Sequence, residues 1–549
     1  MVDEFTERYR DLLTGCYDCV DRIVLNAYFP MGHNPGGFRV WWRQWHDDGD
    51  ESLDNAHLMR LAGRFARRVR AWAEANAVPV IACKADERKH RIAEDYLREH
   101  PVGVGVFLVL VARAPATVWK VTRTSSGVIR NLDKTRQFVN HYSFHIMDPA
   151  FGHITIKMSG HPPFPAQVIL NGHEYVACQA QAAGIGFTKE GNCFTRISDP
   201  ERLAQVADTL SQPGTVGRLS QVIDRWIYTA CLCFGLDLEE QRRGGFGYGY
   251  SVYQVEYSRN LIFASGAVME RAFDTVVDRT RARLDVPTLR TLFGVGHRPH
   301  RPAGADLSPR QAVVIERPKW NLTLFKVHFG LLTLKGYTKG EHVLRFEAIV
   351  HNTRTLRVGR VLEKFPAIVG RLAGMVDRFT TMLDCVDVAF LPDGILEQLP
   401  TPSQIGATRV GGVDVNKART RAVLSAVLAL AVAPEGFTVA DLAGKVQALT
   451  GQTGYTVRQA GYDLRKLRGK HLVDKPGRTR RYHVPEQAAR TIAALITLRE
   501  HVIAPILAGV RRPGPGGAPK THTRIDRDYE HLRDGMRTLL HDLALETAA

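Results

Sequence analysis

Residues 416–485 read NKARTRAVLSAVLALAVAPEGFTVADLAGKVQALTGQTGYTVRQAGYDLRKLRGKHLVDKPGRTRRYHVP, and this stretch predicts a winged helix-turn-helix. Dense apolar content predicts a first helix over 417–431. Thr438 and Thr456 are favourable N-caps for a second and a third helix. Apolar residues recur at helical spacing from Val457 to Leu467 and would face the first two helices. A turn at 474–477 and a basic strand at 478–484 complete the order.

Positive charge gathers on the two elements of this fold that would contact DNA. Residues 409–485 carry 14 Lys and Arg against 5 Asp and Glu. A basic third helix fits the major groove, and a basic wing holds flanking phosphates. The other open interpretation is a winged helix that contacts proteins and has an ordinary solvated face. The candidate nucleic-acid-binding residues of the helix and wing are Arg458, Arg465, Lys466, Arg468, Lys470, Lys475, Arg478, Arg480 and Arg481.

The composition of the whole chain also favours a polyanionic partner. The 549 residues carry a formal net charge of +17, and the sequence pI is about 9.6. The eight cysteines form no disulfide framework, and the single CxxC, Cys16 to Cys19, has no second pair at zinc-finger distance. The charged N-terminus is not typical of a signal peptide, and the apolar runs are too short to span a bilayer. We therefore expect a soluble cytoplasmic protein without a membrane partner.

The expected fold class is α/β plus α+β, a mixed multi-domain body with antiparallel hairpins and a C-terminal winged helix-turn-helix. Strand, helix and strand signals at 78–83, 86–99 and 102–112 predict a βαβ unit. We expect an α/β domain over 1–125, an α+β domain with a histidine-bearing hairpin over 126–300, and a hairpin with a helical continuation over 301–410. The winged helix-turn-helix would occupy 411–510. A linker and C-terminal helix would occupy 511–549, and that helix could support a homodimer.

The clearest hairpin signal is HYSFHIM at 141–147, the turn DPAFG, and HITIKM at 153–158. Tyr142, Phe144 and Ile146 would share one face with the apolar residues of the return strand. His141, His145 and His153 would gather on the other face, where histidines can bind a metal. A solvated polar face is the alternative interpretation of the same pattern.

The following segments contain further candidates. AQVILNGHEYVACQAQAAG predicts a helix over 166–184, and Glu174 inside it needs a partner, which makes it a site candidate. RRGGFGYGY at 242–250 offers Arg242 and Arg243 to phosphates beside a glycine-rich backbone, or is simply a flexible turn. It lacks the Lys-Ser/Thr of a P-loop. The strand predicted over 250–263 carries Glu256 on a polar face.

A second hairpin at 332–352 carries the catalytic hypothesis. Tyr337, Lys339 and Glu347 could lie together beside the histidine-bearing sheet, with the turn expected at 337–341. A tyrosine near a lysine and metal-binding His or Glu is suited to phosphodiester nicking, in which Tyr attacks and Mg²⁺ or Mn²⁺ stabilises the developing charge. Cross-strand charge pairing is the alternative. The catalytic candidates are thus Tyr337, Lys339, Glu347, Glu256 and Glu174.

Four motifs, HYSFHIMDPAFGHITIKM, NGHEYVA, YSVYQVEYSRNLIF and YTKGEHVLRFE, resemble those of a widespread bacterial family of uncharacterised, mobile-element-like proteins. The resemblance covers most of residues 10–485 and implies a C-terminal winged helix but no assigned activity. The Y-x-K and R-x-E hairpin is also similar to one in rolling-circle replication initiators. Family members carry Asp where this chain has Thr338, so a metal ligand from that position would be missing here.

Three functional hypotheses follow. The first is a non-catalytic DNA-binding regulator, although a regulator rarely needs a body of about 400 residues. The second is a DNA-processing protein of a mobile element, a nickase or replication initiator that recognises its site through the winged helix. The third is an RNA-binding protein that uses the Arg/Tyr/Gly loop. We rank DNA binding first, with DNA processing as its favoured elaboration.

Overall fold

The protein is described by a computed structural model. It covers residues 4–84, 87–270, 310–312, 323–329, 331–387, 394–431, 436–451, 454–477 and 479–499, together with a few isolated positions. The C-terminal helix expected within 511–549 lies largely outside the described residues. Arg478 also lies outside them.

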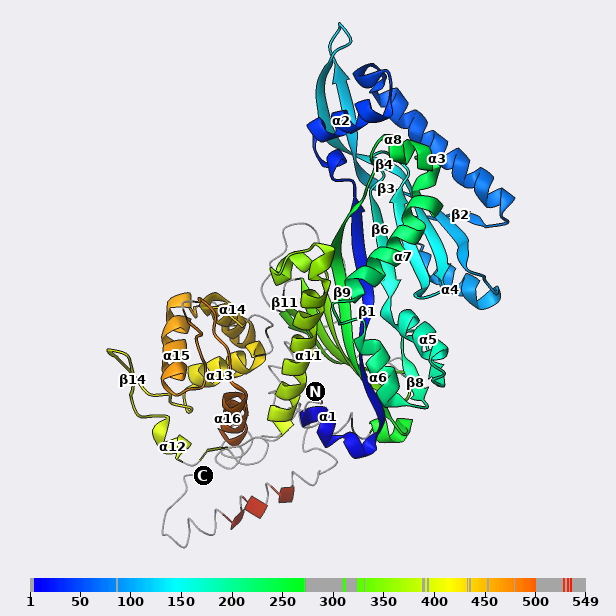
Figure 1. Ribbon diagram of the computed structural model, residues 1–549. Coiled ribbons are helices and arrows are strands. Elements are labelled where there is room, and N and C mark those ends of the chain that lie inside the picture. Colours follow the sequence, from blue (N-terminus) through cyan, green and yellow to red (C-terminus); the bar gives the residue numbers. More distant parts are fainter. Residues whose placement is uncertain are drawn as a thin grey trace, which may run out of the picture.

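One large sheet organises the chain, so the expectation of a mixed α/β body is confirmed (Figure 1). The sheet has 11 strands, and every neighbouring pair is antiparallel except β2 and β3. In spatial order the strands are β10 (Arg310–Ala312), β11 (Thr323–Phe329), β12 (Leu332–Lys339), β13 (Val343–Val350), β9 (Gly249–Phe263), β1 (Leu13–Tyr28), β6 (Ala166–Asn171), β5 (Gly152–Ser159), β4 (Ile129–Asp148), β3 (Gly105–Arg123) and β2 (Val80–Ala82).

This order brings distant segments together. The N-terminal strand β1 lies in the interior of the sheet, between β6 and β9. β2, α4 (Lys89–Glu99) and β3 form the expected βαβ unit, with β2 parallel to β3. The domain boundary expected at residue 125 falls between β3 and β4, which are hydrogen-bonded partners. Strands from the first three expected domains therefore share one sheet.

Helices pack on this sheet and bury an aromatic-rich core. In α3 (Asn55–Ala75) the residues Leu58, Leu61 and Phe65 are buried, as the amphipathic pattern predicts. Trp41 and Trp42 of α2 are fully buried against the same core. The other elements of this body are α1 (Glu4–Arg8), α2 (Pro35–Trp45), α5 (Gly172–Ala182), α6 (Pro200–Asp208), α7 (Thr215–Ala230), α8 (Leu238–Arg243), α11 (Phe365–Asp387), and the two-stranded pair β7 (Phe187–Lys189) and β8 (Phe194–Ile197).

Both predicted hairpins are present, and the first has the facing apolar residues that the alternation predicts. Tyr142, Phe144 and Ile146 pair with Met158, Ile156 and Ile154 across β4 and β5. β12 and β13 pair along their whole length. The expected turn at 337–341 is wrong in detail, because β12 continues to Lys339, so Tyr337 lies within a strand.

The helix predicted over 166–184 is also wrong in its first part. Residues 166–171 form β6, which pairs with both β1 and β5, because the alternating AQVILN segment buries one side of a strand. The helix α5 begins only at Gly172, after the side chain of Asn171 caps it by accepting from the His173 amide. A side chain at Gly172 would collide with the Val20 carbonyl, 1.7 Å from an added Cβ, so this helix start requires glycine.

The C-terminal region has a separate hydrophobic cluster formed by four helices. These are α13 (Ala418–Leu430), α14 (Val439–Thr450), α15 (Val457–Gly469) and α16 (Glu486–Thr497). Thr438 and Thr456 cap α14 and α15 through capping boxes, which confirms the starts of both helices. Isolated bridges join Phe437 to Tyr482 and Asp474 to His483. Before α13 the chain forms the short helix α12 (Ile395–Gln398) and a small hairpin, β14 (Ser403–Ile405) and β15 (Thr408–Val410).

A search for helices that could cross a membrane found none within the part of the chain that the structure describes.

Candidate functional site

A polar row crosses the middle of the sheet on one face. Register aligns Tyr337 with Arg345, Arg345 with Asn260, and Asn260 with Tyr17. The parallel row aligns Lys335, Glu347, Ser258 and Cys19. Four strands from widely separated parts of the chain therefore place polar side chains where a sheet interior is usually apolar.

A β-bulge in β1 adds two charges to this row. Val20 pairs with Tyr257 and Ile23 pairs with Val255, so Asp21 and Arg22 together oppose the single residue Glu256. Such a bulge leaves one residue unpaired and redirects side chains. Asp21 is buried, whereas Arg22 is exposed at the edge of a cavity.

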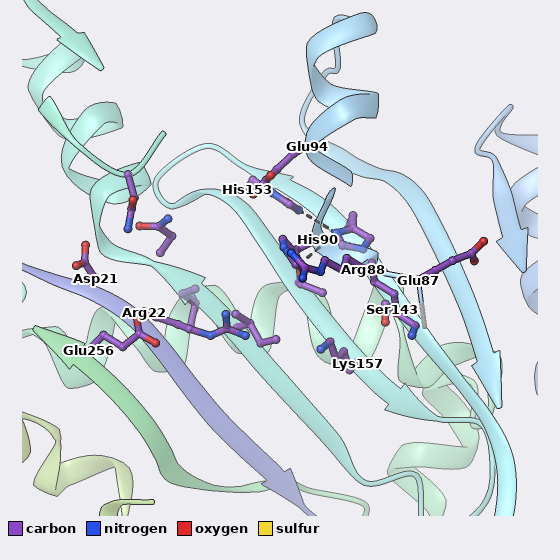
Figure 2. A pocket seen from close by; sticks show the side chains of 17 residues that line it. Asp21, Arg22, Glu87, Arg88, His90, Glu94, Ser143, His153, Lys157 and Glu256 are labelled. Atoms are coloured by element: carbon purple, nitrogen blue, oxygen red, sulfur yellow. Dashed lines mark hydrogen bonds between the residues drawn. The ribbon is translucent and has the colours of Figure 1, made fainter. Parts of the chain in front are cut away.

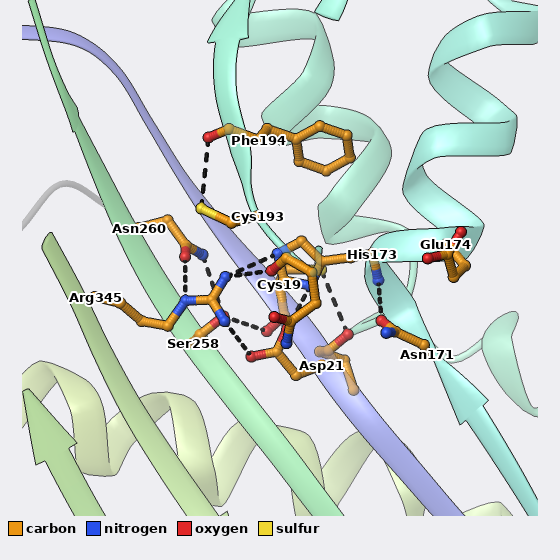
Figure 3. Close-up of polar contacts among 12 residues, drawn as sticks. Cys19, Asp21, Asn171, His173, Glu174, Cys193, Phe194, Ser258, Asn260 and Arg345 are labelled. Atoms are coloured by element: carbon orange, nitrogen blue, oxygen red, sulfur yellow. Dashed lines mark hydrogen bonds and ion pairs between the residues drawn. The ribbon is translucent and has the colours of Figure 1, made fainter. Parts of the chain in front are cut away.

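We define the buried centre as Tyr17, Asp21, His173, Asn260 and Arg345 (Figure 3). The Arg345 guanidinium donates to Asp21 Oδ2 over 3.3 Å and to Asn260 Oδ1 over 2.6 Å. His173 Nδ1 contacts the other Asp21 oxygen, and Tyr17 Oη lies 3.2 Å from His173 Nε2. The centre thus links β1, β9, β13 and α5 through side chains that are almost fully buried.

Electrostatics fix the charge state of this centre. Burial alone would raise the pKa of Asp21, but Arg345 and His173 hold it well below its usual range. Burial lowers the pKa of His173, and Asp21 opposes that shift only in part. A neutral His173 can donate from Nδ1 to Asp21 while Nε2 accepts from Tyr17 and Arg345, which matches the contacts. The centre is therefore an ion pair, Asp21 with Arg345, oriented by a neutral imidazole.

Cys19, Asp21 and His173 are the one group in the described part of the chain whose donor atoms lie close enough together to share a metal ion, all within 4.8 Å. Their surroundings argue against that use. Burial raises the pKa of Cys19 well above its usual value, so the thiol stays protonated, whereas metals bind the thiolate. The Arg345 cation already pairs with Asp21. Mg²⁺ and Mn²⁺ also prefer oxygen ligands.

The catalytic candidates of the second hairpin do lie close together. Lys335 pairs with Glu347, and its Nζ lies 4.7 Å from the centroid of the Tyr337 ring. Burial raises the pKa of Tyr337, and Glu347 raises it further. Burial lowers the pKa of Lys339 to about 8, and Lys339 contacts Asn192. A raised phenol pKa disfavours the phenolate that nucleophilic attack needs.

The two remaining catalytic candidates, Glu256 and Glu174, differ in their relation to Tyr337. Burial raises the pKa of Glu256 to about 7, with a further contribution from Glu347, so Glu256 belongs to the same electrostatic environment. Glu174 lies in the first turn of α5, where it pairs with Lys189 over 2.5 Å. Glu174 therefore has the charge partner that the sequence predicted. The adjacent residue, His173, belongs to the buried centre.

The three candidate metal-binding histidines do not converge. His145 Nδ1 lies 3.0 Å from His153 Nε2 and 3.2 Å from Thr155 Oγ1. His141 lies four residues from His145 on the same strand, which places it roughly 13 Å away at about 3.3 Å per residue. Burial lowers the pKa of His145 to about 3 and that of His153 to about 4, so both rings are neutral near neutral pH.

A cavity of about 450 Å³ opens beside these histidines (Figure 2). Its wall comes from β1, β4, β5, β6, β9 and the start of α4. The charged and histidine side chains around it are Asp21, Arg22, Glu87, Arg88, Lys89, His90, Glu94, His145, His153, Lys157 and Glu256. The sequence pattern pointed to His145, His153 and Glu256, but not to Asp21, Arg22 or Arg345 as members of one site. The available signal was a charged pair, Asp21-Arg22, between the apolar residues Val20 and Ile23 of one strand.

The predicted nucleic-acid-binding residues occupy two regions. Arg458, Arg465 and Arg468 on α15 and Arg480 after it are exposed. Others contact the protein itself: Lys470 donates to the Gln398 carbonyl, Arg481 donates to the Gly436 carbonyl, and the ammonium groups of Lys466 and Lys475 lie over the rings of Tyr462 and Tyr482. Arg242 and Arg243 end α8 in the sheet-containing body, and Arg243 pairs with Asp47. The loop after them is not open, since Phe246 and Tyr248 are buried in the core.

Comparison with protein-family models, with curated proteins and with solved structures returned no match. The resemblance to a bacterial family and to replication initiators therefore stays a prediction. Functional inference rests on the geometry and chemistry of the side chains.

The buried centre predicts a strong dependence of stability on Arg345. Replacing Arg345 with Met leaves Asp21 charged and buried without its cation, which costs roughly 3–5 kcal/mol of unfolding free energy. Urea unfolding should show this loss as a lower midpoint. Arg354→Met, at an exposed arginine, should stay within about 0.5 kcal/mol of the parent. Asp21→Asn added to Arg345→Met should recover part of the loss, and an absence of recovery would exclude charge pairing as its cause.

The paired histidines predict an acid-sensitive stability. The folded rings take up protons only near pH 4 and pH 3, whereas unfolded histidines do so near 6.5. The unfolded state therefore binds more protons in between, and stability falls as pH drops from about 6.5 toward 4, by up to about 1.4 kcal/mol per pH unit for each histidine. Melting temperatures measured from about pH 7 to about pH 4.5 test this. The His145→Gln/His153→Gln variant should give a shallower profile, and an unchanged slope would contradict the assignment.

Proposed function

We propose that the protein binds duplex DNA through a winged helix-turn-helix formed by residues 418–484, with α15 as the helix that enters the major groove. The observation that carries this proposal is the exposed basic stripe of α15. Ala460, Leu464 and Leu467 are buried against the neighbouring helices. Arg458 and Arg465 project from the opposite side, two helical turns apart.

The start of α15 has the features of a base-reading surface. Thr456 caps the helix, and the first residues beyond the cap are exposed. Val457 is 54% exposed and Tyr462 is 43% exposed, so both side chains are accessible to a bound duplex. Apolar groups suit thymine methyls, and Arg suits guanine in the major groove. Recognition helices use their N-terminal residues for such contacts.

The segment after α15 supports the role of a wing. The bridge between Asp474 and His483 closes this segment on itself, and the bridge between Phe437 and Tyr482 holds it against the chain that precedes α14. Arg480 remains exposed between them. Phosphate contacts of this kind position a protein on DNA without reading its sequence.

Binding of RNA and cleavage of a DNA strand are proposals separate from the binding of duplex DNA. An RNA partner would use the same positive charge, but the exposed recognition face of one helix favours a duplex with an accessible major groove, which A-form RNA does not offer. Strand cleavage for a mobile element would draw on Tyr337, Glu256 and Glu347, which share one electrostatic environment. A regulator without catalysis needs only the C-terminal region.

The DNA-binding proposal predicts that Arg465→Ala weakens binding about 5- to 150-fold, because one arginine contact to a base contributes roughly 1–3 kcal/mol. Fluorescence anisotropy with a pooled library of labelled duplexes at several salt concentrations measures this. If Arg465 contacts a phosphate instead, the loss is uniform across sequences and the salt slope falls by about one. The matched control, Arg354→Ala, should bind like the parent. Equal binding by both variants, or stronger competition by structured RNA than by duplex DNA, would overturn the proposal.

The cleavage elaboration makes a separate prediction. If Tyr337 is the nucleophile, Tyr337→Phe abolishes nicking of supercoiled plasmid in Mg²⁺ or Mn²⁺ but leaves the DNA shift intact, because only the hydroxyl is removed. EDTA should also abolish nicking by the parent chain. A single gel shows both the mobility shift of bound DNA and the nicked form of the plasmid. Nicks that persist in Tyr337→Phe remove this residue from the mechanism, and a shift without nicks under any condition leaves DNA binding as the activity.

A further inference from the structure

The N-terminus of α4 is part of the cavity wall. Residues Glu87, Arg88, Lys89 and His90 line the cavity, and the helix begins at Lys89. Among the described residues no side chain caps this helix, and its first turn contains no acidic residue. A helix N-terminus carries unsatisfied amide donors and a partial positive charge, which together attract anions.

Cationic side chains reinforce this end of the cavity. Lys157 of β5 is half-buried, and the structure gives it no hydrogen-bond or ion-pair partner within the described part of the chain. Burial lowers the pKa of Lys157, and the nearby cations Arg22 and Lys89 lower it further. Like charges held together in this way are costly unless an anion joins them.

His145 supplies a second, independent sign of a ligand. Its side chain lines the cavity and is 3% exposed, yet Nε2 has no hydrogen-bond partner among the residues that the structure describes. Nδ1 can accept from Thr155 or from His153, both within 3.2 Å. In that tautomer Nε2 carries the proton and is a buried donor without an acceptor, which is rare unless a ligand supplies one.

The carboxylates that line the cavity have other partners or lie away from these donor groups. Asp21 is paired with Arg345. The side chain of Glu87 accepts from the Lys84 amide over 2.7 Å. Glu256 lies beside Arg22, away from the start of α4 (Figure 2). Glu94 lies one turn further along α4, near His153 (Figure 2).

We propose that this cavity binds a phosphate group, held between Lys157, the N-terminus of α4 and the His145 ring. The cavity volume, about 450 Å³, lies within the usual range for small-molecule pockets. The phosphate belongs either to a small phosphate ester or to a nucleic-acid strand. The site lies in the sheet-containing body and uses none of the residues of the proposed DNA-binding helix.

Titration of the full-length protein tests this proposal with three probes: inorganic phosphate, a nucleoside 5′-monophosphate and a short single-stranded oligonucleotide. Phosphorus NMR and isothermal titration calorimetry report binding. We expect Lys157→Met to weaken binding of the responding probe at least tenfold, because a charge-assisted hydrogen bond is lost. Lys364→Met, at an exposed lysine on another element, should bind as the parent does.

Each outcome is decisive. Binding of phosphate or the monophosphate that is lost in Lys157→Met identifies a small phosphate ester as the source. Binding of the oligonucleotide alone, lost in the same variant, identifies a strand phosphate. Lys89→Met provides a second variant should Lys157→Met fail to fold. Absence of binding to all three probes, or equal binding by the Lys157 and Lys364 variants, overturns the proposal. Arg465→Ala should retain phosphate binding, which separates this site from the proposed DNA-binding surface.

Discussion

The ion pair of Asp21 with Arg345 is the interaction on which the centre of the sheet depends. Both side chains are at most 1% exposed, and charges of this kind are tolerated in a protein interior only when they are paired and hydrogen-bonded. Arg345 also donates to Asn260 and to the Asn192 carbonyl, and His173 Nδ1 contacts the second Asp21 oxygen. The pair therefore fixes the relative positions of β1, β9 and β13 and of the helix α5 that covers them. An apolar pair could pack there, but it would not discriminate between registers so strictly.

The β-bulge connects this centre to the cavity. Because Asp21 and Arg22 oppose one residue of β9, one side chain enters the interior and the next reaches the cavity edge. His173 and Glu174 at the start of α5 also have different environments: the histidine is buried, and the glutamate pairs with Lys189. In the bulge, therefore, Asp21 pairs with Arg345 within the sheet, and Arg22 contributes charge to the cavity.

Much of the local structure could be predicted from the sequence. Alternation identified both hairpins and, in the first, the residues that share its apolar face, because a strand exposes successive side chains to opposite sides. Thr438 and Thr456 marked the starts of two C-terminal helices, because side-chain capping is a local interaction. The strand at 166–171 was missed because a short apolar run does not distinguish a buried strand from a helix. The site was predicted only in part: the pairing of β1 with β6 and β9 is non-local, so no spacing in the sequence places Asp21 beside Arg345. The sequence indicated Glu174 rather than His173 as a site residue, because which of two adjacent residues at a helix start is buried depends on the same tertiary packing.

The position of β1 has a consequence for biosynthesis. The strand is translated long before its two neighbours in the sheet, β6 and β9, which begin at residues 166 and 249. Arg345 lies 324 residues beyond Asp21. During synthesis β1 must therefore wait with both edges unpaired until β6 has been translated, and with one edge unpaired until β9 has been translated. Unpaired strand edges readily associate with other chains. A protein built in this way depends on this strand being kept from wrong partners until β9, which ends at Phe263, has been made.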